Sequence, residues 1–277
     1  MRFLAPGREA VSASIFDQPV FAGMAEFRDL LTAPEWTTVA DLNERLSPLA
    51  HQVTGKSLSL VEQSALVADP IHYELRIFQR GEIATRAENW HDLLNALIWK
   101  KFPAIKSALN ALQAENIARV GTQRRTREQD ALTQFDEAGA VLILRDRNLL
   151  DAWDAHDWPC LFLQHRDAWH DGRISLAIFG HALLEHALRP ELLLVAKTLV
   201  FFDEGVSCAK RHIDQRAADA IAGRTCLRDP QQLRPLPLSG VPGWHQAIQD
   251  SHFYREMPCF RPLRSGRTYP PPMPIES

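Results

Sequence analysis

Two histidines in this chain each lie four residues before a polar side chain with which they could share a ligand. His91 is followed by Asn95, and His181 is followed by Glu185. Residues four apart lie on the same face of an α-helix, so each pair can act on one ligand. Imidazole nitrogens combined with carboxylate and amide oxygens suit a hard or borderline divalent metal ion. If the two segments are neighbouring helices, the four side chains predict a metal site.

Two carboxylates and two arginines could complete an active site around that metal. Asp92 or Asp136 could act as the general base. Arg76 and Arg86 could stabilise an anionic substrate, or they could be buried partners of Asp92 or Glu74. The combination predicts a metal-assisted hydrolase that acts on a small anionic molecule.

The same residues also have a purely structural interpretation. Asp92 fits the third position of a helix capped by Asn89, and the polar pair that starts at His91 fits a buried network that ties loops to the core. The pair that starts at His181 fits a solvated helix face, because its order, H-x-x-x-E-H, differs from the metalloprotease motifs H-E-x-x-H and H-x-x-E-H. The alternative function is therefore a non-catalytic binding or scaffold protein. The two hypotheses differ in whether both helices face one pocket.

The helix that carries His91 is predicted to begin after Asn89 and to end near Lys101. Its apolar stripe faces the core, yet apolar residues also share its polar side, which indicates burial all round. These apolar residues are Trp90, Leu93, Leu94 and Leu97 on the stripe, and Ile98 and Trp99 on the polar side. Residues 180–188 predict the second helix.

Two β-hairpins are predicted beside these helices. The first pairs residues 73–79 with residues 82–85 around Arg80-Gly81, and the second pairs residues 132–135 with residues 140–144. Asp136 and Glu137 would lie in the second turn, where carboxylates are common. The remaining predicted elements are a helix from Pro103 to about Ala114, a helix over 148–155, strands over 174–179 and 198–202, and a helix over 208–222.

Proline is distributed unevenly along the chain and sets its C-terminal part apart. Residues 229–277 hold ten of the 18 prolines, which excludes long helices and central strands there. We expect a helical N-terminal part (1–70), a central core (71–228) and an extended tail (229–277) that packs on the core, with its last residues free. The predicted fold is a single mixed α+β domain, mostly helical, with two or three short hairpins or strands.

The net charge and the cysteine content limit the classes of binding partner and the cellular compartment that we expect. The net charge of −3 argues against nucleic acid and against an anionic membrane surface as the main partner. The arginines at 119–127 could hold a phosphate, but acidic residues follow them directly. Four scattered cysteines fit a reducing compartment, and no apolar segment has the length or character of a secretory signal or a membrane span. We therefore expect a cytoplasmic protein.

Motifs in three parts of the chain occur in the order of a known family. The chain resembles the bacterial domain-of-unknown-function family 3025 over nearly all of its length beyond residue 70. The resemblance implies a bacterial source and a single domain, but no established activity, cofactor or catalytic residue. The segments that carry it include Tyr73–Ile77, Gly81–Arg86, Asn89–Trp99, Asp130–Thr133, Phe135–Glu137, Phe179–Glu185, Pro235–Pro237 and Gly240–Trp244.

Overall fold

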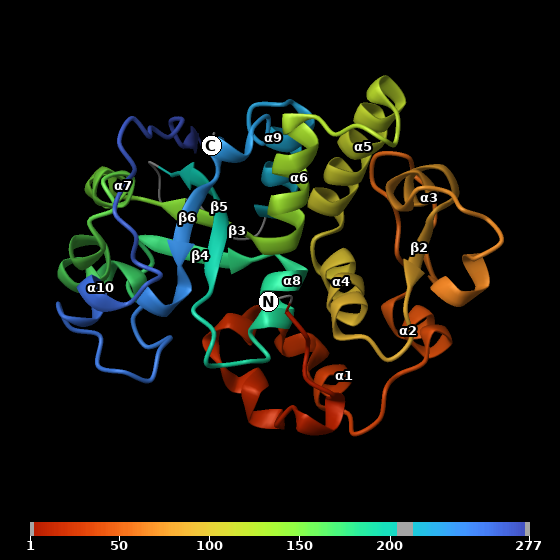
Figure 1. Ribbon diagram of the computed structural model, residues 1–277, viewed down its shortest axis with the longest axis horizontal. Helices are drawn as coiled ribbons and strands as arrows, with labels where there is room; N and C mark the ends of the chain where they lie inside the picture. The colour runs from red at the N-terminus through yellow and green to blue at the C-terminus, as the bar shows by residue number, and fades with distance from the viewer. Residues whose placement is uncertain (1–2, 204–212, 275–277) are drawn as a thin grey trace.

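A five-stranded sheet forms the centre of the computed structural model, which describes residues 3–203 and 213–274. The strand order is β4-β3-β5-β6, and β7 pairs with the far end of β5 (Figure 1). β3 runs parallel to β5, whereas β4 and β6 run antiparallel to their neighbours. The strands are β3 (Gly139–Leu144), β4 (Ile174–Ile178), β5 (Val195–Phe202), β6 (Arg234–Pro237) and β7 (Met273–Pro274).

Helices cover both faces of this sheet. All residues of β3 are buried, as expected for an apolar strand with both faces covered. Figure 1 shows α6, α8 and α9 on one side of the sheet and α7 and α10 on the other. These helices are α6 (Arg127–Ala138), α7 (Arg147–Asp154), α8 (His181–His186), α9 (Ile213–Ala222) and α10 (Phe253–Glu256).

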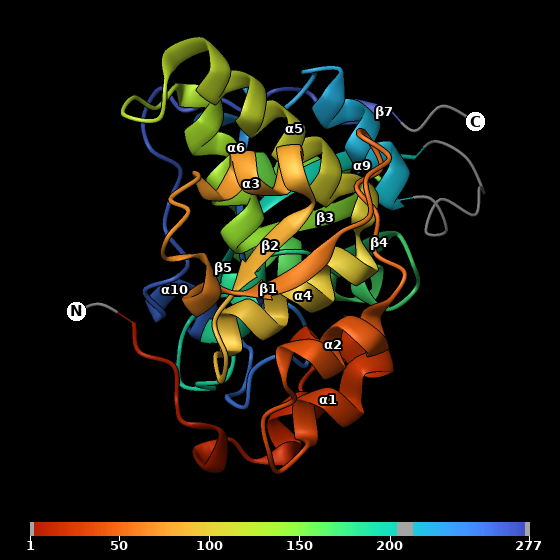
Figure 2. The ribbon, with the colours of Figure 1, turned by 90° about the vertical axis from the view of Figure 1, so that its right-hand side faces the viewer.

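Further elements form an outer layer beyond α6 and α8. The helices α4 (Trp90–Lys101) and α5 (Pro103–Val120) come first. Outside them lie α3 (Tyr73–Arg80) and a parallel pair of strands, β1 (Ser59–Glu62) and β2 (Glu82–Thr85) (Figures 1 and 2).

Short helical turns complete the N-terminal part and the loops. The N-terminal ones are η1 (Arg8–Ala10), η2 (Ala13–Asp17), η3 (Pro19–Phe27), α1 (Arg28–Thr32), α2 (Val39–Leu46) and η4 (Gln63–Leu66). The later ones are a π-helical turn (Cys160–Gln164), η6 (Arg166–Trp169), η8 (Pro230–Gln232) and η9 (Leu238–Gly240).

The first predicted hairpin is wrong, because its first strand is the helix α3. The ring of His72 accepts a hydrogen bond from the N–H of Glu74 and caps the start of the helix. Gly81 ends it in the left-handed conformation and donates its N–H to the carbonyl of Ile77. Strand β2 therefore pairs with β1 instead.

The second predicted hairpin is also wrong, since residues 132–135 belong to α6. Thr126 and Gln129 form a capping box that starts this helix. Leu132 and Phe135 are buried on its inner face. Asp136 and Glu137, predicted to lie in a turn, are instead in the last turn of α6.

Other predictions of secondary structure are confirmed. Asn89 caps α4, Pro103 opens α5, and β4 and β5 occur close to the predicted positions. The predicted start of the last helix at Cys208 lies outside the described residues. The mixed, mostly helical α+β class holds, and the finer division at residues 70 and 228 stays a prediction.

Gly81 is needed for the close approach of α3 to the start of β1. Its φ is 73°, and a Cβ there would lie 2.2 Å from the carbonyl oxygen of Ser57. We expect Gly81→Ala to lower the free energy of unfolding by about 2–4 kcal/mol, measured by urea denaturation. Gly55→Ala is the matched control, because Gly55 has a φ of 71° and its Cβ would meet nothing within 4 Å. Equal losses in both variants would contradict the steric argument.

Candidate metal centre

A cavity of about 590 Å³ lies between α3, α4, α5, α6 and the start of α8. Side chains that are far apart in the sequence meet in it. Seven of the eight predicted site residues line it, namely Arg76, Arg86, His91, Asp92, Asn95, Asp136 and His181. The eighth, Glu185, does not line the cavity but contacts Nδ1 of His91 through its Oε2. The two helices with histidine pairs therefore face one pocket.

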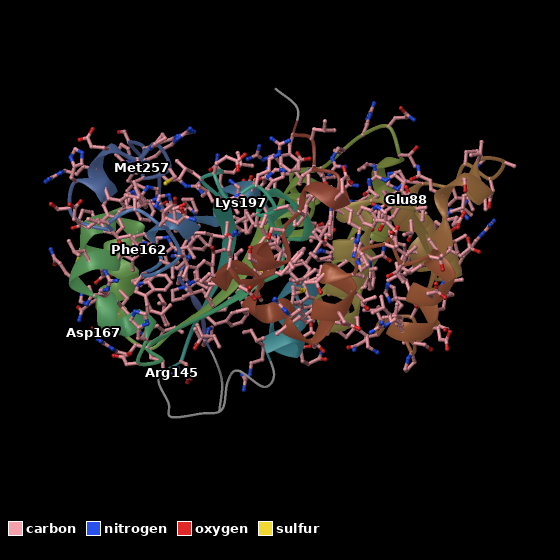
Figure 3. The ribbon with its side chains drawn as sticks, turned by 90° about the horizontal axis from the view of Figure 1, so that it is seen from below. Glu88, Arg145, Phe162, Asp167, Lys197 and Met257 are labelled. Atoms are coloured by element: carbon pink, nitrogen blue, oxygen red, sulfur yellow. The ribbon has the colours of Figure 1, made fainter. Side chains whose placement is uncertain are left out.

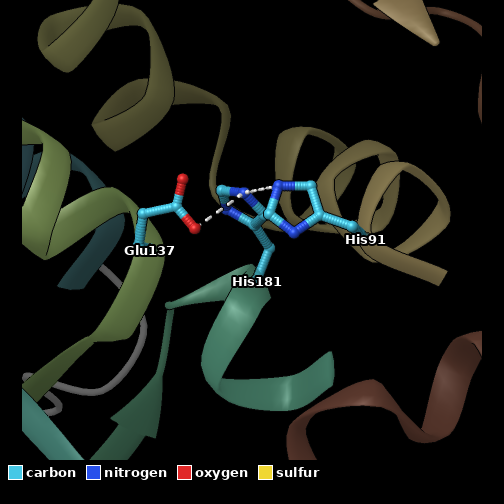
Figure 4. Close-up of side chains that lie close together, drawn as sticks. All are labelled: His91, Glu137 and His181. Carbon is cyan, nitrogen blue, oxygen red and sulfur yellow. Dashed lines mark hydrogen bonds and ion pairs between the residues drawn. The ribbon is translucent and has the colours of Figure 1, made fainter. Parts of the chain in front are cut away.

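The two histidine rings meet edge to face at the boundary of α4 and α8. Their Nε2 atoms are 3.1 Å apart, and the ring planes are inclined by 76° (Figure 4). The Nδ1 atom of His91 lies 2.9 Å from Oε2 of Glu185, on the side of the ring that faces away from His181. A carboxylate in this position fixes the tautomer of a neutral imidazole, because Nδ1 must carry the hydrogen. The Nε2 atom of neutral His91 then presents its lone pair to His181.

His181 differs from His91, because no carboxylate of the described residues lies within hydrogen-bonding distance of its Nδ1. Its side chain is buried, and its Nδ1 has no hydrogen-bond partner within the described structure. The nearest carboxylate oxygen to that atom is Oδ2 of Asp136, at 3.9 Å. Burial lowers the pKa of His181 to about 3, so the ring is neutral at pH 7. Because a separation of 3.9 Å is too long for a hydrogen bond, Asp136 does not fix the tautomer of His181, and either ring nitrogen can carry the hydrogen.

With its hydrogen on Nε2, neutral His181 donates a hydrogen bond to Nε2 of His91 at 3.1 Å, whereas with its hydrogen on Nδ1 two lone pairs face each other and need a cation between them. A proton on His91 meets this need at low pH. Burial lowers the pKa of His91, but the hydrogen bond to Glu185 and the charge of Glu137 outweigh it, and the pKa is raised above its ordinary value. A divalent metal ion meets the same need with both rings neutral. The contact therefore fits either a hydrogen bond between the two rings or a shared cation.

Glu137 supplies a third donor. Its Oε2 is 3.8 Å from Nε2 of His181, and the three candidate ligand atoms lie within 4.8 Å of one another. Zinc–nitrogen bonds of 2.0–2.1 Å place tetrahedral ligand atoms about 3.3 Å apart, so small side-chain movements would complete the site. Glu137 has this freedom, since its side chain is 42% exposed. Catalytic zinc and ferrous iron sites commonly use two imidazoles and one carboxylate as ligands. The remaining coordination positions of the ion are then open to water or substrate.

Asn95 lies beside this centre but uses both ends of its amide elsewhere. Its Oδ1 accepts from Nζ of Lys106 at 2.9 Å, and its Nδ2 donates to the hydroxyl of Tyr73 at 2.9 Å. Lys106 is buried and also donates to Oδ1 of Asp136 at 2.6 Å. Burial opposes ionisation of Asp136, but the charge of Lys106 and its hydrogen bond to the carboxylate hold the pKa of Asp136 below the usual value. The network fixes Asp136 behind His181.

Both predicted arginines are in ion pairs. Arg86 donates through Nε and Nη2 to the two carboxylate oxygens of Asp92, at 2.9 and 2.8 Å. Arg76 is buried and pairs with Glu82 and Asp69. The side chain of Arg86 is 50% exposed, which leaves it the better placed of the two to meet a ligand.

Glu74 lines the cavity as a carboxyl group with a raised pKa. Burial and the nearby charge of Asp136 raise the pKa of Glu74 to about 7, although Asn110 donates to its Oε2 at 2.6 Å. Sequence analysis considered Glu74 only as an ion-pair partner. A carboxyl group that titrates near neutrality is suited to exchange protons with a substrate.

The raised pKa of Glu74 predicts a pH-dependent stability. Between pH 4.5 and 7 the folded state holds a proton that the unfolded state releases, so the free energy of unfolding falls as pH rises through this window. Glu74→Gln removes the free-energy cost of ionising a buried carboxyl group. We therefore expect the change in the free energy of unfolding caused by Glu74→Gln to be about 1–2 kcal/mol more favourable at pH 8 than at pH 5. Urea denaturation at both pH values measures this difference. The exposed Glu44→Gln serves as control, and a Glu74→Gln effect that does not change with pH would contradict the prediction.

Glu137 and Lys106 are the contributors that sequence analysis did not assign to the site. The capping box at Thr126 and Gln129 was the available signal for α6. On that helix, Thr133, Asp136 and Glu137 are three and four residues apart, and all of them line the cavity. No local sequence signal marks Lys106 as a site residue, because the residues around it could equally surround a lysine on an exposed helix face.

Other polar candidates lie away from the cavity. His186 packs its ring against Phe3, with ring centroids 4.0 Å apart. Asp203 is buried and pairs with Arg145, whereas Glu204 lies outside the described residues. Cys160, Cys226 and Cys259 are free thiols. Among the helices described, none combines the length and the apolar character that crossing a membrane requires.

A family model described as "Protein of unknown function (DUF3025)" matches residues 58–264. The chain belongs to this family. The matched region contains α3 to α8 and therefore every residue of the candidate metal centre. No curated protein and no solved structure matches the chain. The family carries no assigned activity, so a function must be argued from the site itself.

Proposed function

We propose that this protein is a metal-dependent hydrolase of a small molecule, with the ion held by His91, His181 and Glu137. The observation that carries the proposal is the pair of opposed Nε2 atoms, with Glu137 beside them and Glu185 hydrogen-bonded to Nδ1 of His91. Carboxylates behind ligand histidines orient the rings and increase their basicity. A bound divalent ion would supply Lewis acidity and a water of lowered pKa.

The residues around the ion have separable roles in this proposal. Glu185 and Asp136 orient the two histidines, and Lys106 holds Asp136 in place. Sequence analysis named Asp92 or Asp136 as the base, but each is paired with a cation. Glu74, with a pKa of about 7 in the same cavity, is better suited to take and return a proton.

The cavity favours a small substrate of mixed polarity. Its volume of about 590 Å³ is in the range of small-molecule sites. Leu66, Val67 and Ile71 contribute apolar surface to its wall. The half-exposed Arg86 is the group that would meet a negative charge, which keeps an anionic substrate as the proposed class.

The alternative is a non-catalytic binding or scaffold protein. The observation in its favour is the hydrogen-bonded chain from Tyr73 through Asn95 and Lys106 to Asp136, which satisfies the buried polar groups of Asn95 and Lys106. Such networks fix a unique packing without any chemistry.

A metal-reconstitution assay separates the two functions. The chelated protein is loaded in turn with Zn²⁺, Mn²⁺ and Fe²⁺ and is assayed on carboxylic ester, phosphate ester and amide substrates. We expect hydrolysis of one class that depends on the ion and is lost in His91→Ala. His186→Ala, with a histidine of α8 outside the cavity, should keep the activity. Stoichiometric metal without hydrolysis of any class would favour the binding protein.

A further inference from the structure

A second cavity, of about 670 Å³, lies across α6 from the first. Gln134 lines this cavity, whereas its neighbour Thr133 lines the other. Its floor is the start of β5, and much of its wall is the proline-rich segment from Pro258 to Tyr269. Figure 3 shows Lys197, near the start of β5, on the same side of the molecule as Met257 and away from Arg145.

Positive charge gathers in this cavity without a matching negative charge. Lys197, Arg261, Arg264 and Arg267 line it, and none of the described residues that line it is an aspartate or a glutamate. Lys197 points from a strand in the interior of the sheet and is half-buried. Burial, together with the charges of Arg267 and Arg264, lowers its pKa.

The nearby carboxylates are hydrogen-bonded to other arginines, although the charge of Asp229 also acts on Arg267. Asp229 accepts two hydrogen bonds from Arg127, both at 2.8 Å. Asp154 accepts from Nε and Nη2 of Arg234 at 2.6 and 2.9 Å. Arg267 has its guanidinium 4.6 Å from the ring centroid of Tyr269, which holds the guanidinium beside the cavity.

Apolar side chains form the rest of the lining. Val195 is two residues before Lys197 on β5, so both point to the same face of the sheet. Leu193, Leu233 and Pro235 lie alongside. A ligand that fits this surface has a negatively charged head group for the cations and an apolar body for the floor.

We infer that this cavity is a binding site for a small organic anion with an apolar body and a phosphate or carboxylate head group. The site shares no lining residue with the metal centre, so either proposal can fail without the other. It also gives the proline-rich tail a role, because fixed proline backbones hold the arginines over β5.

The test uses the fluorescent probe anilinonaphthalene sulfonate, which combines an aromatic body with one negative charge. We expect saturable binding that phenyl phosphate or benzoate displaces and that neutral benzyl alcohol does not. The stronger of the two displacing anions identifies the head group. Failure of both anions to displace the probe would overturn the inference.

Substitutions of residues that line the cavity test whether the probe binds there. Lys197→Gln is expected to weaken binding about tenfold or more, since a charge-assisted contact is lost, and Lys197→Arg to keep it within about threefold. Arg264 is exposed, so Arg264→Gln leaves the fold intact and should weaken binding several-fold. Arg124→Gln removes the same charge from an exposed loop and is the control. If Lys197→Gln and Arg264→Gln bind the probe with the same affinity as Arg124→Gln, the probe does not bind in this cavity and the inference is overturned.

Discussion

Replacing His181 by alanine is expected to lower the affinity for Zn²⁺ by about a thousandfold or more. Loss of an orienting partner of a ligand costs about 10–100-fold in metal affinity, and loss of the ligand itself costs more. His181 is central to the site, because its Nε2 lies 3.1 Å from the Nε2 of His91 and 3.8 Å from the Oε2 of Glu137. Titration against a chromophoric chelator measures the affinity.

A graded series of variants tests the assigned roles around that ligand. Glu185→Gln should lower the affinity by about 10–100-fold, because Glu185 orients His91 without binding the ion. His186→Ala is the control on the same helix and should stay within about threefold of the wild type. Equal zinc affinity in His181→Ala and His186→Ala would rule out the assignment of the ligands.

Replacing Lys106 by methionine is expected to lower the free energy of unfolding by about 3–5 kcal/mol, since it leaves the charge of Asp136 without its partner. The Nζ atom of Lys106 is 2.6 Å from Oδ1 of Asp136, and the lysine side chain is only 5% exposed. Methionine keeps the length and the apolar stem of the lysine, but it also removes the ammonium that lies 5.2 Å from the ring centroid of Trp99. Urea denaturation at pH 7 measures the loss.

A double-mutant cycle separates the ion pair from other effects of the substitution. Asp136→Asn removes the partly buried charge that Lys106→Met leaves unpaired. We expect the double variant to lose clearly less stability than the sum of the two single losses. Additive losses would show that the two groups do not interact in the folded protein. The metal is removed with a chelator first, so that its release does not contribute.

Seven of the eight residues predicted from the sequence line one cavity, although two of the elements that carry them, α3 and α6, were predicted wrongly. His91 lies on a long helix whose cap at Asn89 and apolar faces are local signals, and α4 formed as expected. Asp136 was assigned to a turn, because the apolar run before it resembles a short strand. Its inclusion in the site survived this error, since its chemistry did not depend on the element.

Long-range contacts explain what sequence reasoning could not reach. His91 and His181 are ninety residues apart, and only the packing of α4 on α8 brings their Nε2 atoms together. The alternating pattern at residues 73–79 favoured a strand, yet Gly81 and the backbone of Ser57 select a helix followed by a parallel pairing. That choice places Glu74 in the cavity, which a hairpin would not have predicted.

X-ray absorption spectroscopy of the zinc-loaded protein tests the central claim most directly. We expect one zinc per chain, two imidazole ligands at about 2.0–2.1 Å and only oxygen ligands besides, with loss of the imidazole signal in a folded variant that lacks both His91 and His181. Sulfur in the first coordination shell, or an unchanged spectrum in that variant, would contradict a metal centre at these residues.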